Sequence, residues 1–150
     1  MTTVKVKKLS QNALVPEYMS QGASGCDVMA CLEEPLDVAP LARAAIPTGL
    51  AVEIPEGFEI QVRPRSGLAF KKGLTVINAP GTIDSDYRGE VKVLVVNLGR
   101  EPVKISHGDR VAQLILQKVE RICWQPSSDL AHSQRDMGGF GSTGIRSETH

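Results

Sequence analysis

The sequence predicts an all-β domain, either a β-sandwich or a barrel, with one short helix and a polar C-terminal tail. Apolar and polar residues alternate over several short segments, which is typical of half-buried strands. Turn-forming residues separate these segments about every ten residues, as in sandwiches and barrels. The last stretch, 127–150, is instead polar and rich in glycine.

The individual strands follow from the alternation. Val91, Val93 and Val95 belong to a β-branched run that ends at Asn97. The same period of two residues predicts further strands at 4–9, 46–54, 59–63 and 111–119. Proline, glycine and aspartate mark the turns between them, at 54–57, 98–102 and 106–109.

One short helix is expected within 65–73. Ser66 is expected as its N-cap, because a serine hydroxyl can accept a hydrogen bond from the first helical turn. Gly73 is expected to end it, because glycine readily adopts the left-handed conformation found after helices. Gly67 lowers the helix propensity of this segment.

Composition divides the chain into a β-domain at 1–126 and a flexible arm at 127–150. The arm has one aromatic residue, Phe140, and cannot bury enough apolar surface to order itself. It is therefore either a frayed tail or an arm that orders on a ligand or on a neighbouring subunit.

Composition also excludes several classes of function. The formal net charge is zero, so no overall basic field attracts nucleic acid. No run approaches the ~18 apolar residues of a membrane span, and the first eight residues lack the apolar stretch of a secretory signal. Cys26, Cys31 and Cys123 cannot all pair within one chain. We therefore expect reduced thiols, a cytoplasmic location, and neither nucleic acid nor membrane as partner.

The tail contains a glycine pattern with two interpretations. Residues 139–144 match G-x-G-x-x-G, but the strand, helix and downstream acidic residue of a dinucleotide site are missing. The glycine amides, Ser142, Thr143 and the guanidinium of Arg135 can nevertheless wrap a phosphate chain. A solvated linker is the alternative.

Two further segments have chemical and structural interpretations. At 64–68, an arginine precedes the start of the expected helix, which suits an anion, although an ordinary helix start is the simpler alternative. At 81–89, Asp84 and Asp86 would share one face of a strand. One of them would then act as a base or both would bind a divalent cation. An aspartate-rich hairpin is the alternative.

The segments 23–28 and 108–114 contain polar residues that are most simply structural, Asp27 in a turn and Gln113 on a strand. Histidine chemistry is disfavoured, because the three histidines show no zinc-site spacing and no G-x-S-x-G elbow is present.

Taken in chain order, the segments 23–28, 64–68, 81–89, 108–114 and 135–144 closely resemble the five motifs of the trimeric dUTP diphosphatases (dUTPases). The resemblance covers most of the chain. It implies a distorted jelly-roll β-barrel, a homotrimer, and hydrolysis of dUTP to dUMP and pyrophosphate with Mg²⁺ as cofactor. Such an enzyme limits uracil in DNA and supplies dUMP for dTMP synthesis. Each active site would lie at a subunit junction and be completed by the arm of another chain.

The resemblance also implies roles for individual residues. Asp84 matches the general base that deprotonates the water attacking the α-phosphorus, and Gln113 matches a residue near that water. Tyr87 matches the aromatic residue that packs on deoxyribose and excludes a 2′-hydroxyl. The chain from Thr75 through Asn78 to Ile83 matches the hairpin that receives uracil.

The remaining matches concern phosphate and metal. Arg65, Ser66 and Gly67 match the residues that contact the β- and γ-phosphates. Asp27 matches an aspartate linked either to the water shell of the metal or to structural hydrogen bonds, and the Mg²⁺ would be held mainly by the triphosphate. In the arm, the matching substrate-binding residues are Arg135, Phe140, Gly141, Ser142 and Thr143, with Phe140 stacking on uracil.

One departure from the family pattern is Asp136, which stands where a glycine usually follows the motif arginine and adds a negative charge near the triphosphate.

Two alternatives to a dUTPase remain open. A dCTP deaminase shares the barrel and an arginine-serine motif, although deaminases are longer and lack the Asp84–Tyr87 pattern. A nucleotide-binding or partner-binding trimer without turnover is the non-enzyme alternative.

Overall fold

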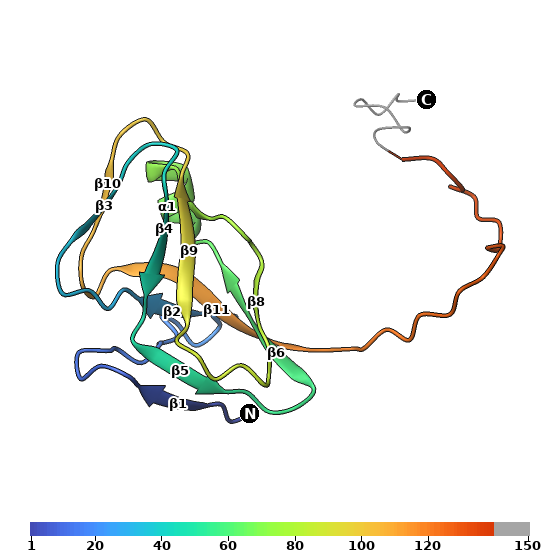
Figure 1. Ribbon diagram of the computed structural model, residues 1–150, viewed down its shortest axis with the longest axis horizontal. Helices are drawn as coiled ribbons and strands as arrows, with labels where there is room; N and C mark the ends of the chain where they lie inside the picture. Colours follow the sequence, from blue (N-terminus) through green and yellow to red (C-terminus); the bar gives the residue numbers. More distant parts are fainter. Residues whose placement is uncertain (140–150) are drawn as a thin grey trace. The chain divides into compact units, whose positions relative to one another are not determined.

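The structure, a computed structural model that describes residues 1–139, is built almost entirely from short strands (Figure 1). Its strands are β1 (Lys5–Lys8), β2 (Cys26–Met29), β3 (Leu36–Val38), β4 (Arg43–Pro47), β5 (Leu50–Glu53), β6 (Phe58–Arg63), β7 (Leu74–Val76), β8 (Gly81–Ile83), β9 (Lys92–Asn97), β10 (Val103–Ile105) and β11 (Arg110–Lys118). The helix α1 (Ser66–Lys72) lies between β6 and β7. The all-β prediction is confirmed.

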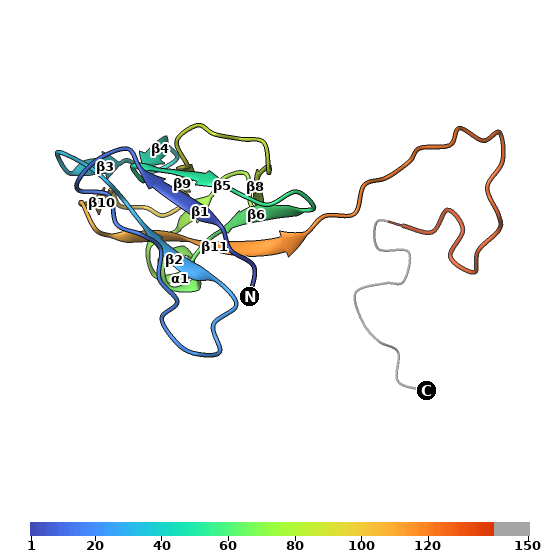
Figure 2. The ribbon, with the colours of Figure 1, turned by 90° about the horizontal axis from the view of Figure 1, so that it is seen from below.

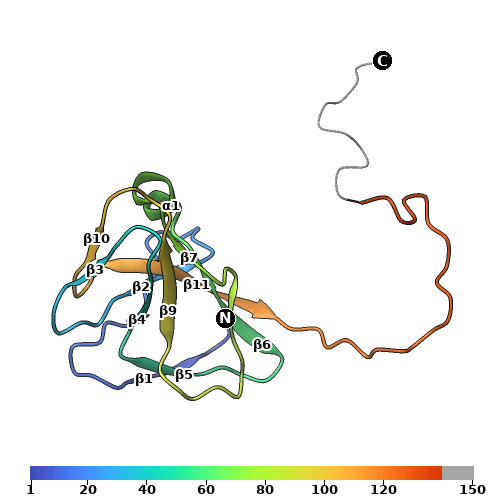
Figure 3. The same cartoon turned by 45° about the horizontal axis from the view of Figure 1, so that its top comes forward.

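The strands form four antiparallel sheets with crossovers between distant parts of the chain. The largest has the order β2-β11-β6-β8, and a second has the order β4-β9-β7. Two-stranded sheets join β1 to β5 and β10 to β3. In two views β4 and β9 run across β11 (Figures 1 and 3), and a third view shows them as a separate layer above β2 and β11 (Figure 2).

The core lies between these layers and consists mainly of β-branched residues. Val28, Ile46, Val93 and Ala112 are fully buried and come from four different strands. All belong to a single cluster of buried apolar side chains. Because alternate residues of each strand face this cluster, the period of two in the sequence reflects real burial.

The predicted strands are confirmed at β1, β6, β9 and β11, with boundaries that differ by at most one residue. The single strand expected at 46–54 is wrong. It is two strands, β4 and β5, separated at Thr48 and Gly49, and Gly49 has a φ of 67°. The strands β2, β3, β7, β8 and β10 are short, and their own sequences carry too few alternations to predict them.

The helix is present, but its expected cap is wrong. Arg65 is the N-cap and makes no side-chain capping bond, and Ser66 is already helical. Gly73 does end the helix, with a φ of 71°, and its amide bonds to the carbonyls of Leu68 and Ala69. A side chain at Gly73 would also collide with the backbone of Gly99, so this position requires glycine.

By its internal contacts the chain divides into Met1–Glu120 and Arg121–His150. The sequence predicts the boundary after residue 126. In the structure, residues 121–126 lie outside the strands and belong to the second unit. Among the residues that the structure describes, no helix is long and apolar enough to cross a membrane.

The side chain of Asn97 connects the end of β9 to the end of β3 and to the loop that follows β9. It is fully buried, and its Nδ2 donates to the carbonyls of Val38 and Glu101, each at 2.8 Å. Its Oδ1 accepts from the amide of Gly99 at 2.8 Å. One side chain thus hydrogen-bonds three backbone groups from two parts of the chain.

We expect Asn97→Ala to lower the free energy of unfolding by about 2 to 3 kcal/mol, because a fully buried side chain and its three hydrogen bonds to backbone groups would be lost. Urea unfolding followed by circular dichroism at a fixed protein concentration measures the change. Leu98→Ala is the control, since Leu98 is 63% exposed and should matter by less than about 0.5 kcal/mol. Equal unfolding midpoints for the two variants would contradict the role of Asn97.

Candidate functional site

A pocket of about 450 Å³ opens beside β8 and the loop that follows it. Its polar side chains come from Asn78, Thr82, Asp84, Tyr87 and Glu90, together with Lys92. Its apolar wall comes from β6, β8 and β9 and from the residue before β9. The residues of that wall are Val62, Ile83, Val91 and Leu94. The structure therefore brings together the predicted site residues Asn78, Ile83, Asp84 and Tyr87.

Asp84 and Asp86 do not share the face of a strand, so that part of the prediction is wrong. β8 ends at Ile83, and Asp84 begins a turn in which the amide of Tyr87 donates to the Asp84 carbonyl at 3.2 Å. The three-residue strand ends here because β6 pairs with it only at Ile83, Thr82 and Gly81. Asp84 is exposed and lines the pocket, as a residue that must reach water and substrate would.

Asn78 and Gly81 also line the pocket. A Cβ added to Gly81 would lie 3.0 Å from Nδ2 of Asn78 and 3.2 Å from Cβ of Val62, so the amide of Asn78 lies directly over the glycine. The peptide bond between Ala79 and Pro80 is cis and turns the chain between these residues. An amide with both donor and acceptor atoms thus lies in the pocket lining, and such a group suits the edge of a base.

A second polar cluster surrounds the carboxylate of Asp27. Asp27 is only 2% exposed, and its Oδ2 lies 3.3 Å from Nη2 of Arg65 and 3.4 Å from Nη1 of Arg110. Its Oδ1 accepts a hydrogen bond from Nε2 of Gln113 at 3.1 Å. The cluster therefore unites residues from three of the five segments singled out in the sequence.

Strand register explains why these residues meet. Asp27 of β2 lies opposite Gln113 of β11, and Gln113 in turn lies opposite Arg63 at the end of β6. Arg65 follows two residues later and also donates from Nη1 to the Arg110 carbonyl at 3.0 Å. A shift of register between Arg110 and Ala112 interrupts the pairing beside this bond.

Arg110 is a member of this cluster that the sequence did not indicate. It lies in the segment 108–114, but nothing in that segment alone connects it to Asp27. Its Nη1 also lies 3.1 Å from Sδ of Met19, which holds the guanidinium in place from a distant loop. Only the pairing of β2 with β11 brings these parts of the chain together.

The cluster has a surplus of positive charge, because one carboxylate faces two guanidinium groups. Arg65 is about a quarter exposed and Arg110 nearly half exposed, so both retain N–H groups for an outside partner. Guanidinium groups anchored in this way suit phosphate oxygens. Both oxygens of Asp27 are engaged by protein groups, which favours the structural role over a role in the water shell of a metal.

The Asp84 pocket and the Asp27 cluster lie apart within one chain. Ile83 pairs with position 60 of β6, whereas Gln113 pairs with position 63 on the opposite side of β6. These positions differ by roughly 10 Å along the strands and roughly 10 Å across the sheet. A single chain therefore does not bring Asp84 and Gln113 to the same water molecule, which would need both within about 3 Å.

Within residues 1–139 no group of three or more His, Cys, Asp or Glu side chains is arranged to hold a metal ion. A magnesium ion at this site would take its ligands from phosphate oxygens and water, with the cluster of arginines beside the phosphates. This donor set suits Mg²⁺, which keeps several waters and binds together with substrate phosphates.

The described part of the arm contains Arg135 in a tight turn. Its Nε donates to the Gly138 carbonyl at 2.7 Å, and the Gly138 amide donates to the Arg135 carbonyl at 2.8 Å. Asp136 has a φ of 42°, in the left-handed region that glycine adopts without strain and that aspartate also tolerates. Its carboxylate lies 3.5 Å from Nδ1 of His132. The predicted residues Phe140, Gly141, Ser142 and Thr143 lie outside the described residues.

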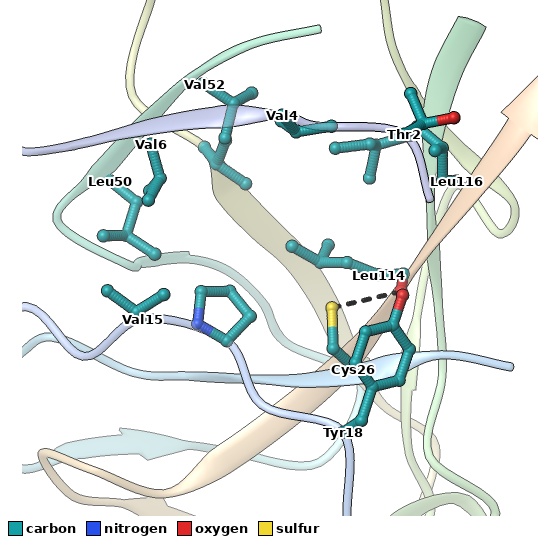
Figure 4. A pocket seen from close by; sticks show the side chains of 13 residues that line it. Thr2, Val4, Val6, Val15, Tyr18, Cys26, Leu50, Val52, Leu114 and Leu116 are labelled. Atoms are coloured by element: carbon teal, nitrogen blue, oxygen red, sulfur yellow. Dashed lines mark hydrogen bonds between the residues drawn. The ribbon is translucent and has the colours of Figure 1, made fainter. Parts of the chain in front are cut away.

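A separate apolar cavity of about 240 Å³ lies between β1 and the sheet that contains β11 (Figure 4). Its wall includes Val4, Leu50, Leu114 and Cys26, whose thiol donates to the Leu114 carbonyl at 3.5 Å. Burial raises the pKa of the Cys26 thiol, so the thiol stays protonated and unreactive at neutral pH. This cavity contains no charged group and lacks the chemistry of the first pocket.

Comparison with known proteins associates this arrangement with one family. The family model described as dUTPase matches residues 11–144. A deoxyuridine 5′-triphosphate nucleotidohydrolase of Treponema denticola is 52% identical over 92% of this chain and 96% of its own. One of Rickettsia conorii is 51% identical over 97% of this chain and 99% of its own.

A solved structure shows the same architecture. The dUTPase of Staphylococcus bacteriophage 80alpha, solved with dUpNHpp, has a TM-score of 0.85 and 27% identity. The match covers 97% of this chain and 100% of the other. The expected distorted jelly-roll barrel is thereby confirmed, and the relatives favour the dUTPase alternative over the deaminase.

We expect Asp27→Asn to lower the free energy of unfolding by about 2 kcal/mol, because two arginines would lose the buried charge that they share. Their partial exposure limits the cost through solvent screening. Urea unfolding measures the loss, which should be the same in EDTA and in Mg²⁺ if Asp27 has only a structural role. Asp37→Asn, at an exposed carboxylate of β3, is the control. A loss that appears only with Mg²⁺ would assign Asp27 to the metal.

Proposed function

This chain belongs to the dUTPase family, and we propose that it hydrolyses dUTP to dUMP and pyrophosphate with Asp84 as general base. The observation that carries the proposal is the pocket that joins Asn78, Asp84 and Tyr87. It gathers a side-chain amide, an aromatic ring and an exposed carboxylate around one cavity. These are the three groups that a deoxynucleotide hydrolase needs for base, sugar and water.

Asp84 would hold a water molecule and take its proton as the oxygen attacks the α-phosphorus. The bond that breaks joins the α-phosphorus to the bridging oxygen, and pyrophosphate leaves with that oxygen. Asp84 suits this task because it is exposed in the pocket and its turn projects from the end of β8. Gln113 would orient the same water from the other cluster.

Selectivity would come from two groups of pocket residues. Asn78 and neighbouring backbone groups would bind the edge of uracil, and the limited depth beside Gly81 would exclude the methyl group of thymine. Tyr87 would pack on the deoxyribose and collide with a 2′-hydroxyl. Exclusion by collision differs from loss of a contact, because the wrong substrate is actively rejected.

The triphosphate would be bound by the arginines around Asp27. Arg65 is held by Asp27 and by the Arg110 carbonyl, so its remaining N–H groups are positioned before the substrate arrives. The amides of Ser66 and Gly67 start α1 beside it and would contact the β- and γ-phosphates. A bound Mg²⁺ would be held by phosphate oxygens and would neutralise part of their charge.

A complete site would need more than one chain. Because Asp84 and Gln113 lie apart within a chain, we propose that the Asp84 pocket of one subunit faces the Asp27 cluster of another in a homotrimer. The arm of a further chain would close the site, with Arg135, Gly141, Ser142 and Thr143 at the phosphates and Phe140 at the base. In the cell such an enzyme would act in the cytoplasm, limit uracil in DNA and supply dUMP, with neither nucleic acid nor membrane as partner.

The proposed base is tested by Asp84→Asn, which keeps the shape of the side chain but cannot accept the proton. We expect kcat for dUTP to fall by about 10³-fold or more, while the Kd for dUTP changes by less than about 3-fold. Pyrophosphate release with Mg²⁺ and equilibrium binding measure the two quantities. The unmodified protein is assayed alongside with dUTP, dCTP, dTTP and UTP.

Near-normal turnover by Asp84→Asn would show that another group is the base. Ammonia release from dCTP by the unmodified protein would instead support the deaminase. Binding of dUTP without pyrophosphate release would support the non-enzyme trimer.

The shared site is tested by mixing two inactive variants, Asp84→Asn and Arg65→Ala. If the two clusters of one site come from different chains, refolding the variants together places an intact Asp84 opposite an intact Arg65 in some sites. We therefore expect mixed trimers to regain a clear fraction of the normal kcat, measured by pyrophosphate release. Each variant refolded alone is the control. No regain in mixtures that light scattering shows to be trimeric would mean that each site is built from one chain.

A further inference from the structure

The loop that follows β8 is stabilised largely by its own backbone carbonyls. The guanidinium of Arg88 donates from Nη1 to the carbonyls of Ser85 at 2.7 Å and of Tyr87 at 2.9 Å. The amide of Tyr87 donates to the carbonyl of Asp84. These bonds connect Asp84 and Tyr87 within one turn, although both residues are exposed.

The ring of Tyr87 folds back over Gly89. A Cβ added to Gly89 would lie 2.6 Å from Cζ and 3.0 Å from Cε2 of Tyr87, and would overlap its hydroxyl oxygen. These distances are far below van der Waals contact, so any side chain at position 89 displaces the ring. The conflicting atoms are the tip of a side chain that is 45% exposed, so the ring can move outward without disturbing the backbone.

The hydroxyl of Tyr87 is attached to a part of the chain that the core holds firmly. It donates to the carbonyl of Glu90 at 3.0 Å. The carboxylate of Glu90 accepts from the amide of Gly49 at 3.0 Å, and the amide of Val91 donates to the carbonyl of Leu50 at 2.8 Å. The ring is therefore fixed at both ends, through its own backbone and through its hydroxyl.

We propose that Gly89 and the Glu90 carbonyl are the specificity-positioning elements that set the discrimination between deoxyribose and ribose. They hold the Tyr87 ring at one place beside the pocket, so the ring acts as a rigid wall. A Tyr87 ring that moves aside would leave room for a 2′-hydroxyl, whereas a ring held in place excludes it. The inference rests on the proposed function, in which Tyr87 packs on the sugar.

This role predicts a particular change in selectivity. A residue needed only for folding lowers activity toward dUTP and UTP in equal proportion. A residue that positions the wall raises kcat/KM for UTP relative to dUTP, because only the ribonucleotide gains from a displaced ring. The ratio of the two kcat/KM values therefore separates positioning from stability.

Gly89→Ala is the main test, because the added methyl group displaces the Tyr87 ring but conflicts with no atom of Asp84 or of the Tyr87 backbone. We expect the preference for dUTP over UTP to fall by about 10-fold or more, with kcat for dUTP changing much less. Tyr87→Phe, which keeps the ring and removes only its bond to Glu90, should lower the preference by about 5-fold. Gly22→Ala is the matched control, since nothing lies within 4 Å of its added Cβ.

A preference that stays unchanged in both variants, or equal losses toward both nucleotides in folded Gly89→Ala, would overturn the proposal. A crystal structure of Gly89→Ala gives a readout independent of turnover, and an undisplaced Tyr87 ring would also overturn it. Absence of dUTP hydrolysis by the unmodified protein would remove the proposed function itself, and the position of the ring in Gly89→Ala would still be testable.

Discussion

The buried carboxylate of Asp27 is the interaction on which the phosphate side of the site depends. It is nearly inaccessible, and it faces Arg65, Arg110 and Gln113 at once. A buried charge is stable only when it is paired and hydrogen-bonded, so these three side chains are not free to adopt other arrangements. The carboxylate thereby converts flexible arginines into positioned cations, without needing to touch a substrate itself.

The loop with Asp84 differs from the buried Asp27 cluster, since its important side chains are exposed. No core surrounds them, and the loop is ordered by carbonyls that accept from Arg88 and Tyr87. Its end is attached to the core where Thr48 Oγ1 donates to the Val91 carbonyl at 2.6 Å. Exposure for chemistry and a fixed position are therefore compatible, because the backbone rather than side-chain packing supplies the rigidity.

The separation between the Asp84 pocket and the Asp27 cluster has a consequence for the assembly of subunits. β6 lies between β8 and β11, so the two polar groups lie on opposite sides of it. Neither group alone combines a water-activating carboxylate with anchored cations. A second copy of the chain is the simplest way to bring both to one triphosphate, and the same argument explains why an arm from outside the barrel would be useful.

The sequence by itself determined the all-β class, the longer strands and the end of α1, because each depends on local periodicity or on a glycine conformation. The order of five motifs also indicated Asp84, Tyr87 and Arg65. Only the tertiary structure decided that Ser66 is not the cap and that Asp84 lies in a turn, since β8 is held by pairing and not by its own pattern. It alone revealed Arg110 beside Asp27 and the Tyr87 ring over Gly89. Contacts between residues far apart in the chain, and the direction of a side chain, leave no period in a sequence from which they could be predicted.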